Sequence, residues 1–186
     1  MAVVPFLAVF TLAACNNNGE NDANIYSGSV DHADMEHVNS GEVPEGLNEA
    51  KNPTYKLLSK AVIKANHMEG MKGAEATIVG AYDTMVYSVS YNPTNGGKRI
   101  ENHKWVVHEE ILNADENPFG PGDQVIIDGE HMKGMDGETA IIHSAKKATV
   151  YMVDFVPTGG EPKVTNHKWL TESEPSPKRA EKTKGT

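Results

Sequence analysis

The chain has 186 residues, of which 38% are hydrophobic and 23% are charged, and its net charge at pH 7 is −9. This length allows one or two small domains, and the mean hydropathy of −0.48 indicates that most of the chain is soluble. The excess of acidic residues repels phosphate backbones, so it excludes nucleic acid as a partner and suits cations instead.

The amino-terminal segment is an apolar run from Ala2 to Ala14, which has the length of the apolar region of a secretory signal. It is too short to cross a bilayer, since that takes about 20 residues. Leu12-Ala13-Ala14-Cys15 resembles the lipobox of bacterial lipoproteins, in which the cysteine thiol carries diacylglycerol and the leader is cleaved just before it. We therefore expect a signal peptide at 1–14 and a lipid-anchored protein on the extracellular face of a Gram-positive cell membrane. The alternative is an incidental cysteine in a buried strand.

The next segment, residues 15–51, is predicted to be a flexible acidic tether, because 20–50 contain no Lys or Arg and few large apolar residues. Within it, Asp31–His37 holds two imidazoles, one thioether and three carboxylates, which a mobile segment can wrap around a metal ion. A solvated polar linker is an equally good interpretation. The candidate ligands in this segment are His32, Met35 and His37.

An internal repeat at an offset of 64 positions decides the organisation of the remaining chain, as the step from His67 to His131 illustrates. His67-Met68-Glu69-Gly70-Met71-Lys72-Gly73 recurs as His131-Met132-Lys133-Gly134-Met135-Asp136-Gly137. Asn-His-Lys-Trp at 102–105 recurs at 166–169 without a gap. Chance does not produce this agreement, so we infer that one structural unit was duplicated.

Each unit has the pattern of short β-strands. β-branched and aromatic residues mark Ala74–Ala81 and Met85–Tyr91, and short apolar runs at Lys60–Ile63 and Val125–Ile127 lie near turn residues. Short strands separated by glycine-rich turns predict an all-β chain of two tandem, small, SH3-like β-barrel modules. The expected boundaries are 52–115 for the first module, 116–174 for the second, and 175–186 for a disordered tail.

Methionine and histidine dominate the repeated motif. Thioethers are good ligands for Cu(I), and imidazole binds Cu(I), Cu(II), zinc and nickel. A glycine between the two methionines lets the backbone turn sharply, so that several side chains can converge on one ion. The candidate ligands are His67, Met68, Met71, His131, Met132 and Met135. The alternative is that the methionines fill the hydrophobic cores.

The Asn-His-Lys-Trp motif adds His103 and Trp105 to the first unit, and His167 and Trp169 to the second. A site of two methionines, a histidine and a tryptophan would resemble that of a small periplasmic copper-chaperone barrel, in which an indole face contacts Cu(I). The alternative is that the tryptophans anchor the cores and that the two histidines lie exposed beside them. Because His108 and His143 do not recur at the offset, we expect them to be structural or surface residues.

Signatures of enzymes are missing from the sequence. It has no activated-serine elbow, P-loop, dinucleotide fingerprint or HExxH motif. Its one cysteine, Cys15, would be consumed by the lipid, and no spacing of carboxylates singles out an acid–base pair. We therefore expect a protein that is not an enzyme.

The two repeated motifs, with Gly41–Leu47 and the lipobox, are similar to those of the YdhK-like lipoprotein family, from the lipobox to about Glu174. This resemblance implies a Gram-positive surface lipoprotein with two tandem copies of one domain. Because the family includes a copper-binding resistance lipoprotein, it also implies copper sequestration outside the membrane by the His-Met motif. We therefore expect a monomer that binds copper as Cu(I), Cu(II) or both. The alternative function is a surface module that binds a protein, a glycan or a cell-wall component without a metal.

Overall fold

The structure, a computed structural model, describes residue 38 and residues 40–178. This part of the chain is all-β, as the sequence predicts, apart from one short 3-10 turn, η2 (His108–Glu110). No helix in these residues is long and apolar enough to cross a membrane. The strands are β1 (Asn48–Glu49), β2 (Lys60–Ile63), β3 (Glu75–Tyr91), β4 (Ile100–Val107), β5 (Gln124–Ile126), β6 (Thr139–Phe155), β7 (Val164–Thr171) and β8 (Pro175–Pro177).

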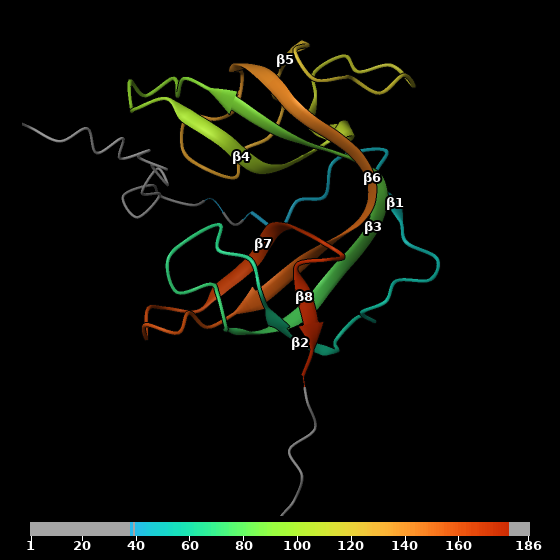
Figure 1. The fold of residues 1–186 in the computed structure, drawn as a ribbon, viewed down its shortest axis with the longest axis vertical. Helices are drawn as coiled ribbons and strands as arrows, with labels where there is room; N and C mark the ends of the chain where they lie inside the picture. Colours follow the sequence, from blue (N-terminus) through green and yellow to red (C-terminus); the bar gives the residue numbers. More distant parts are fainter. Residues whose placement is uncertain (1–37, 39, 179–186) are drawn as a thin grey trace, which may run out of the picture.

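The two longest strands, β3 and β6, form the axis of the molecule. They pair antiparallel from Ala76 opposite Phe155 to Tyr91 opposite Ala140, and they run side by side through both ends of the fold (Figure 1). The sequence predicts two strands at 74–81 and 85–91, whereas the structure joins them in the 17-residue β3. The join is possible because residues 82–84 continue the ladder with β6, which supplies the partner for their backbone groups.

The fold has two lobes, each with its own hydrophobic core, and each core contains residues from both sequence repeats. Core A lies at the lobe of β2, β7 and β8, and core B lies at the lobe of β4 and β5 (Figure 1). Core A contains Ala61, Ile63, Met71, Ala74, Ala76, Ile78, Ala81, Tyr151, Val153, Phe155 and Leu170. Core B contains Tyr87, Val89, Tyr91, Ile100, Val106, Ile111, Val125, Ile127, Met135, Ala140 and Ile142. The repeats at 52–115 and 116–174 therefore do not coincide with the lobes.

A third apolar cluster joins the two lobes, and it contains both tryptophans. Its buried members are Tyr82, Val86, Trp105, Val107, Val150, Met152 and Trp169. Trp105 is 7% exposed and Trp169 is fully buried. The tryptophans thus pack in the cluster shared by the lobes, rather than one in each core.

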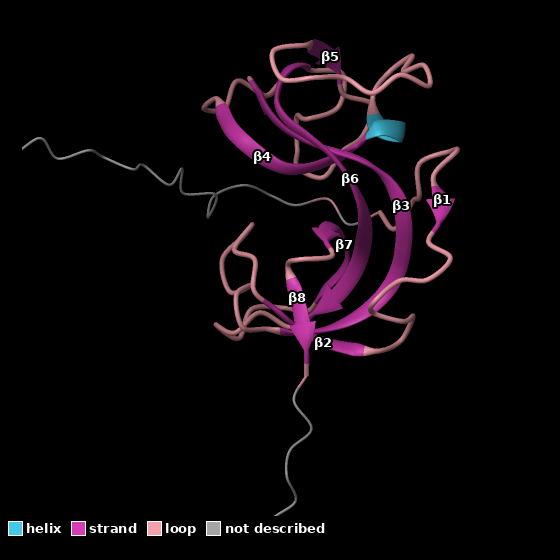
Figure 2. Ribbon diagram, turned by 45° about the vertical axis from the view of Figure 1, so that its right-hand side comes forward, coloured by secondary structure: helices cyan, strands magenta, loops and turns pink. Residues whose placement is uncertain are grey.

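Ordered structure begins earlier and ends later than the sequence predicts. Val38 donates its backbone N–H to the carbonyl of His131 across 2.9 Å, and β1 pairs with β3, although both lie in the predicted tether. At the other end, β8 pairs with β2 through Pro175–Pro177, where the sequence predicts the start of a disordered tail (Figure 2). Such short segments carry weak sequence signals, because their pairing partners and contacts, such as the bond from the Ser176 hydroxyl to the Val62 carbonyl, come from distant parts of the chain.

Candidate metal centre

The repeated His-Met motif folds into the same tight turn in both repeats. The Met71 N–H donates to the Met68 carbonyl at 3.3 Å, and the Met135 N–H donates to the Met132 carbonyl at 3.2 Å. The third residue of each turn is a glycine with positive φ, 70° at Gly70 and 80° at its counterpart in the second repeat. A type II turn requires this conformation, so the glycine of the motif explains the turn.

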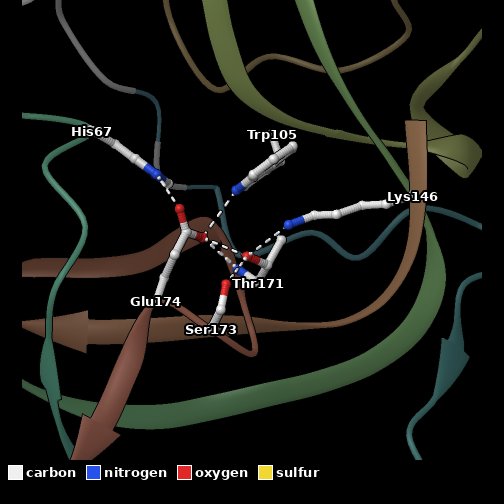
Figure 3. A network of polar contacts seen from close by, with 6 residues as sticks. All are labelled: His67, Trp105, Lys146, Thr171, Ser173 and Glu174. Carbon is white, nitrogen blue, oxygen red and sulfur yellow. Dashed lines mark hydrogen bonds and ion pairs between the residues drawn. The ribbon is translucent and has the colours of Figure 1, made fainter. Parts of the chain in front are cut away.

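The turn of the first repeat presents His67 to a buried carboxylate, Glu174. The Nε2 of His67 lies 2.8 Å from Oε1 of Glu174, while the indole N–H of Trp105 donates to Oε2 at 2.9 Å (Figure 3). The backbone N–H and hydroxyl of Thr171 also donate to Oε2, at 2.6 and 3.0 Å. The carboxylate is therefore held from four directions and fixes the histidine ring.

The second repeat builds the same arrangement with the roles of the repeats exchanged. The Nε2 of His131 lies 2.7 Å from Oε1 of Glu110, and the indole N–H of Trp169 donates to Oε2 at 3.0 Å. The backbone N–H of Val107 donates to the same oxygen at 3.1 Å. Each centre thus joins a histidine of one repeat to a glutamate of the other.

These contacts keep both carboxyls ionised and determine which ring nitrogen carries the proton. Burial alone would raise the pKa of Glu174, but the hydrogen bond and charge of His67, with Thr171 and Trp105, lower it to about 2. Burial opposes ionisation of Glu110 too, yet the charge and hydrogen bond of His131 hold its pKa below the usual value. Since an ionised carboxylate only accepts, each Nε2 is the donor.

The other ring nitrogen of each of these histidines is buried and open. Among the described residues, neither Nδ1 of His67 nor Nδ1 of His131 has a hydrogen-bond partner. The charged ring that lowers the pKa of the glutamate carries a second N–H at this atom, whereas the neutral ring, protonated at Nε2 alone, carries a lone pair there. A buried lone pair without a partner is costly unless a ligand occupies it, which makes Nδ1 the candidate donor atom of each centre.

A second imidazole lies close to each of them. The ring centres of His67 and His167 are 6.3 Å apart, and those of His131 and His103 are 5.9 Å apart. His103 and His167 are buried, 8% and 4% exposed, so they do not lie at the surface. Within the described residues, no three or more His, Cys, Asp or Glu side chains converge as a metal site of those ligands requires. The two pairs of imidazoles are therefore the candidate ligands that the described residues bring together.

The four methionines of the motif fall into two environments. Met71 and Met135 are fully buried and belong to cores A and B, as the packing alternative expects. Met132 receives a hydrogen bond from the hydroxyl of Tyr91 at 3.9 Å, and the same tyrosine ring lies 6.2 Å from the ring of His103. Met68 is partly buried and packs against core A. Met68 and Met132 are thus the two thioethers of the motif that are not buried members of cores A and B.

Both indoles are occupied by protein groups. Besides its bond to Glu174, Trp105 has the ammonium group of Lys146 at 4.2 Å from its ring centre, and Trp169 meets Tyr82 edge-on at 5.7 Å. A face already covered by an ammonium group is a poor site for a second cation. We therefore assign the tryptophans to holding the carboxylates.

An acidic cavity of about 700 Å³ opens beside the second centre and reaches Glu110. Its charged lining consists of Glu42, Glu45, Glu109, Glu110, Asp128, Glu130 and Lys168. At the matching positions beside Glu174, the first repeat has Lys64 and Asn66 in place of Asp128 and Glu130. The two centres thus share their histidines, glutamate and tryptophan but differ in the charge around them.

The two carboxylates that hold the histidines, Glu110 and Glu174, are not among the candidate metal ligands that the sequence predicts. They lie at the same offset of 64 as the histidines, so a search of the repeat for every matched ionisable residue finds them. His108 bonds Tyr87 and His143 bonds Ser90, both outside the two centres. The candidates His32, Met35 and His37 lie outside the described residues.

Comparison with known proteins places these features in a family. A family described as "Protein of unknown function (DUF1541)" matches residues 59–108 and again 121–172. The "Uncharacterized protein YdhK" of Bacillus subtilis (strain 168) is 53% identical over 181 residues, which are 96% of this chain and 88% of that protein.

Solved structures of that Bacillus subtilis protein have the same fold. A crystal structure matches with a TM-score of 0.72 at 60% identity and covers 74% of this chain and 93% of that one. A solution NMR structure of the carboxy-terminal domain matches with a TM-score of 0.63 at 58% identity, over 66% of this chain and 93% of that one. Two matched segments in tandem and an identity above one half over nearly the whole length leave one conclusion. The chain belongs to the DUF1541, or YdhK-like, family.

Proposed function

We propose that this protein binds copper at the two His–Glu centres and lowers the concentration of free copper outside the cell, anchored by lipid at Cys15. The observation that carries the proposal is the open Nδ1 of His67 and of His131, each in a ring whose Nε2 is held by a buried carboxylate. This carboxylate–histidine arrangement is the one that orients metal ligands and raises their basicity. It needs no catalytic step.

The spacing of the imidazoles supports one ion per pair. Two imidazoles that bind one ion from opposite sides, through metal–nitrogen bonds of about 2 Å, have ring centres roughly 6 Å apart. The separations of 6.3 and 5.9 Å agree with this value. The ion would be held by one histidine from each repeat.

The choice of copper follows from the donor set. Two imidazoles with a thioether from Met68 or Met132 are soft ligands of low number, which suit Cu(I) and leave zinc short of its tetrahedral set. The acidic cavity beside Glu110 adds a field that attracts cations to the second centre. Copper resistance through sequestration is the activity that such sites support.

A copper titration tests this proposal directly. The chain from Asn16 to Thr186 is titrated with Cu(I) against a chromophoric chelator, and the stoichiometry and affinity are measured. We expect about two tight sites for the unchanged chain, and about one for His67→Gln or His131→Gln. His143→Gln is the matched control, because it removes an exposed imidazole outside both centres and leaves two sites. Binding that is equal in all four chains would contradict the proposal.

A second function, a surface module that recognises a protein, a glycan or a wall component without metal, is favoured by two observations. Met71 and Met135 are core residues, and both indole N–H groups already have acceptors. On this alternative the His–Glu pairs serve stability alone. The titration separates the two, because a module without a metal role binds no Cu(I) beyond a variant that lacks both His67 and His131.

A further inference from the structure

The turn before β2 exposes two adjacent leucines at one end of the molecule. Leu57 is 60% exposed and Leu58 is 79% exposed, the two highest values among the exposed large hydrophobic residues of the described chain. The turn that holds them leads into β2, which pairs with β8 at one end of the fold (Figure 1). Burial in the fold therefore does not account for these side chains.

The backbone at this turn makes the leucines more unusual. Leu58 has φ of 63°, a left-handed conformation that is unfavourable for a residue with a Cβ. At the matching position of the second repeat stands Gly122, with φ of 96°, preceded by Pro121. Proline and glycine suit such a turn, whereas two leucines suit neither the turn nor water. An unfavourable residue without a packing role indicates a function.

The charge around the leucines also differs between the repeats. Residues 50–64 contain four lysines and no Asp or Glu, in a chain whose net charge is −9. The four lysines, all exposed, are Lys51, Lys56, Lys60 and Lys64. The matching segment of the second repeat, 114–128, contains four acidic residues and no Lys or Arg. Lys60 lies 3.8 Å from Glu75, which also pairs with Lys178, so the turn presents its two leucines beside an excess of lysines over carboxylates.

We propose that this leucine turn, residues 56–60, docks on a membrane surface that contains anionic lipids. Leu57 and Leu58 would enter the boundary between headgroups and acyl chains, and the lysines would lie against the lipid phosphates. Lysine suits this position, because its long stem reaches along an apolar surface while its charge stays at the headgroups. The complementary charge favours a lipid surface over an apolar groove on another protein.

Vesicle binding tests the docking surface without the lipid anchor. The chain from Asn16 to Thr186 lacks the apolar leader and Cys15, and a solved structure that matches 65% of this chain, at 58% identity, indicates that a shorter piece of the chain folds alone. It is sedimented with vesicles of phosphatidylcholine, alone or mixed with phosphatidylglycerol. We expect binding to the mixed vesicles and little binding to the neutral ones.

The second repeat supplies the variant that isolates the leucines. Leu57→Pro with Leu58→Gly installs the turn of the second repeat, so the fold should keep or gain thermal stability. We expect vesicle binding to fall about tenfold for each leucine removed. The matched control is Leu112→Ser, which removes a leucine that is 45% exposed in the other lobe and should leave vesicle binding unchanged.

The lysines are tested separately. Lys56→Glu should weaken binding to the anionic vesicles at least about fivefold and leave the weak binding to neutral vesicles unchanged. Equal binding of the unchanged chain to both kinds of vesicle would overturn the proposal. So would a Leu57→Pro, Leu58→Gly variant that binds as tightly as the unchanged chain.

Discussion

His67 and Glu174 stand 107 positions apart in the chain, and 2.8 Å separate Nε2 of the histidine from Oε1 of the glutamate. The bond links the first repeat to the second, and its counterpart between His131 and Glu110 links them in the opposite sense. Neither repeat can therefore complete a centre by itself. Each hydrophobic core is likewise built from residues of both repeats, so the centres and the cores depend on the same pairing of the two repeats.

The ionised carboxyl of Glu174 makes stability depend on acid. Its pKa is lowered from 4.5 to about 2 in the folded chain, so unfolding takes up a proton between these values. The contribution of this group is complete above about pH 4.5 and is lost as the pH falls towards 2. We expect the difference in free energy of unfolding between the unchanged chain and Glu174→Gln, measured with urea, to shrink over this range. A difference that stays constant from neutral pH to about pH 2 would contradict this expectation.

The two centres differ at one aromatic residue, which is Tyr91 beside His103 and Phe155 beside His167. The Tyr91 hydroxyl donates to the sulfur of Met132 and occupies one of its lone pairs. Tyr91→Phe frees that sulfur, so we expect Cu(I) affinity at the second centre to rise about fivefold, as the loss of one competing hydrogen bond allows. Competition titration of a chain that also carries His67→Gln measures this centre alone. An affinity that falls would show that the hydroxyl supports the site.

The methionines give a matched pair of variants. Met68→Leu with Met132→Leu removes the two thioethers next to the histidines and should weaken Cu(I) binding about tenfold or more, while Cu(II) binding changes little. Met71→Leu with Met135→Leu changes only the cores and should leave Cu(I) binding intact. Each core change costs less than about 1.5 kcal/mol, because leucine nearly conserves the volume. A larger loss of Cu(I) binding in the core pair than in the first pair would reverse the assignment of ligands.

Because each core combines residues of both repeats, the structure predicts which fragments of the chain can fold. Core B lies entirely within residues 87–142, so a fragment of residues 83–149 should be a folded monomer. A fragment of residues 52–115 holds half of core A and half of core B, and it should be unfolded or form a dimer that restores both cores. Circular dichroism and size-exclusion chromatography distinguish these states. A folded monomer of 52–115 would show that a repeat is an independent unit after all.

The sequence predicts the all-β class and the duplication well, because both rest on local patterns and on a gapless offset. It cannot predict that β3 and β6 are continuous through both lobes, since a strand pattern does not state which partner pairs with it. The exchanged cores follow from that pairing. A repeat detected in sequence therefore indicates a shared unit of structure without locating its boundaries in space.

The sequence also predicts only part of the candidate site, because the pairing of the repeats in space decides which residues meet. His67, His131, His103 and His167 are brought together in pairs, but across the repeats rather than within each one. Glu110 and Glu174 are two of the 26 acidic residues in the chain, and although the offset of 64 matches them to each other, it does not show that they are buried against the histidines. Burial of a charged residue depends on tertiary packing, which no local pattern encodes.

The residues of core B lie, along the sequence, between the two segments that form core A. This order affects how the chain folds during synthesis. Core B can assemble once about residue 142 has been synthesised, but core A joins Ala61 to Leu170 and must wait for nearly the entire polypeptide. A prematurely terminated product leaves Ile63, Ile78 and their neighbours uncovered, which exposes it to proteases and aggregation. Completion of the last long strand thus distinguishes finished molecules from defective ones.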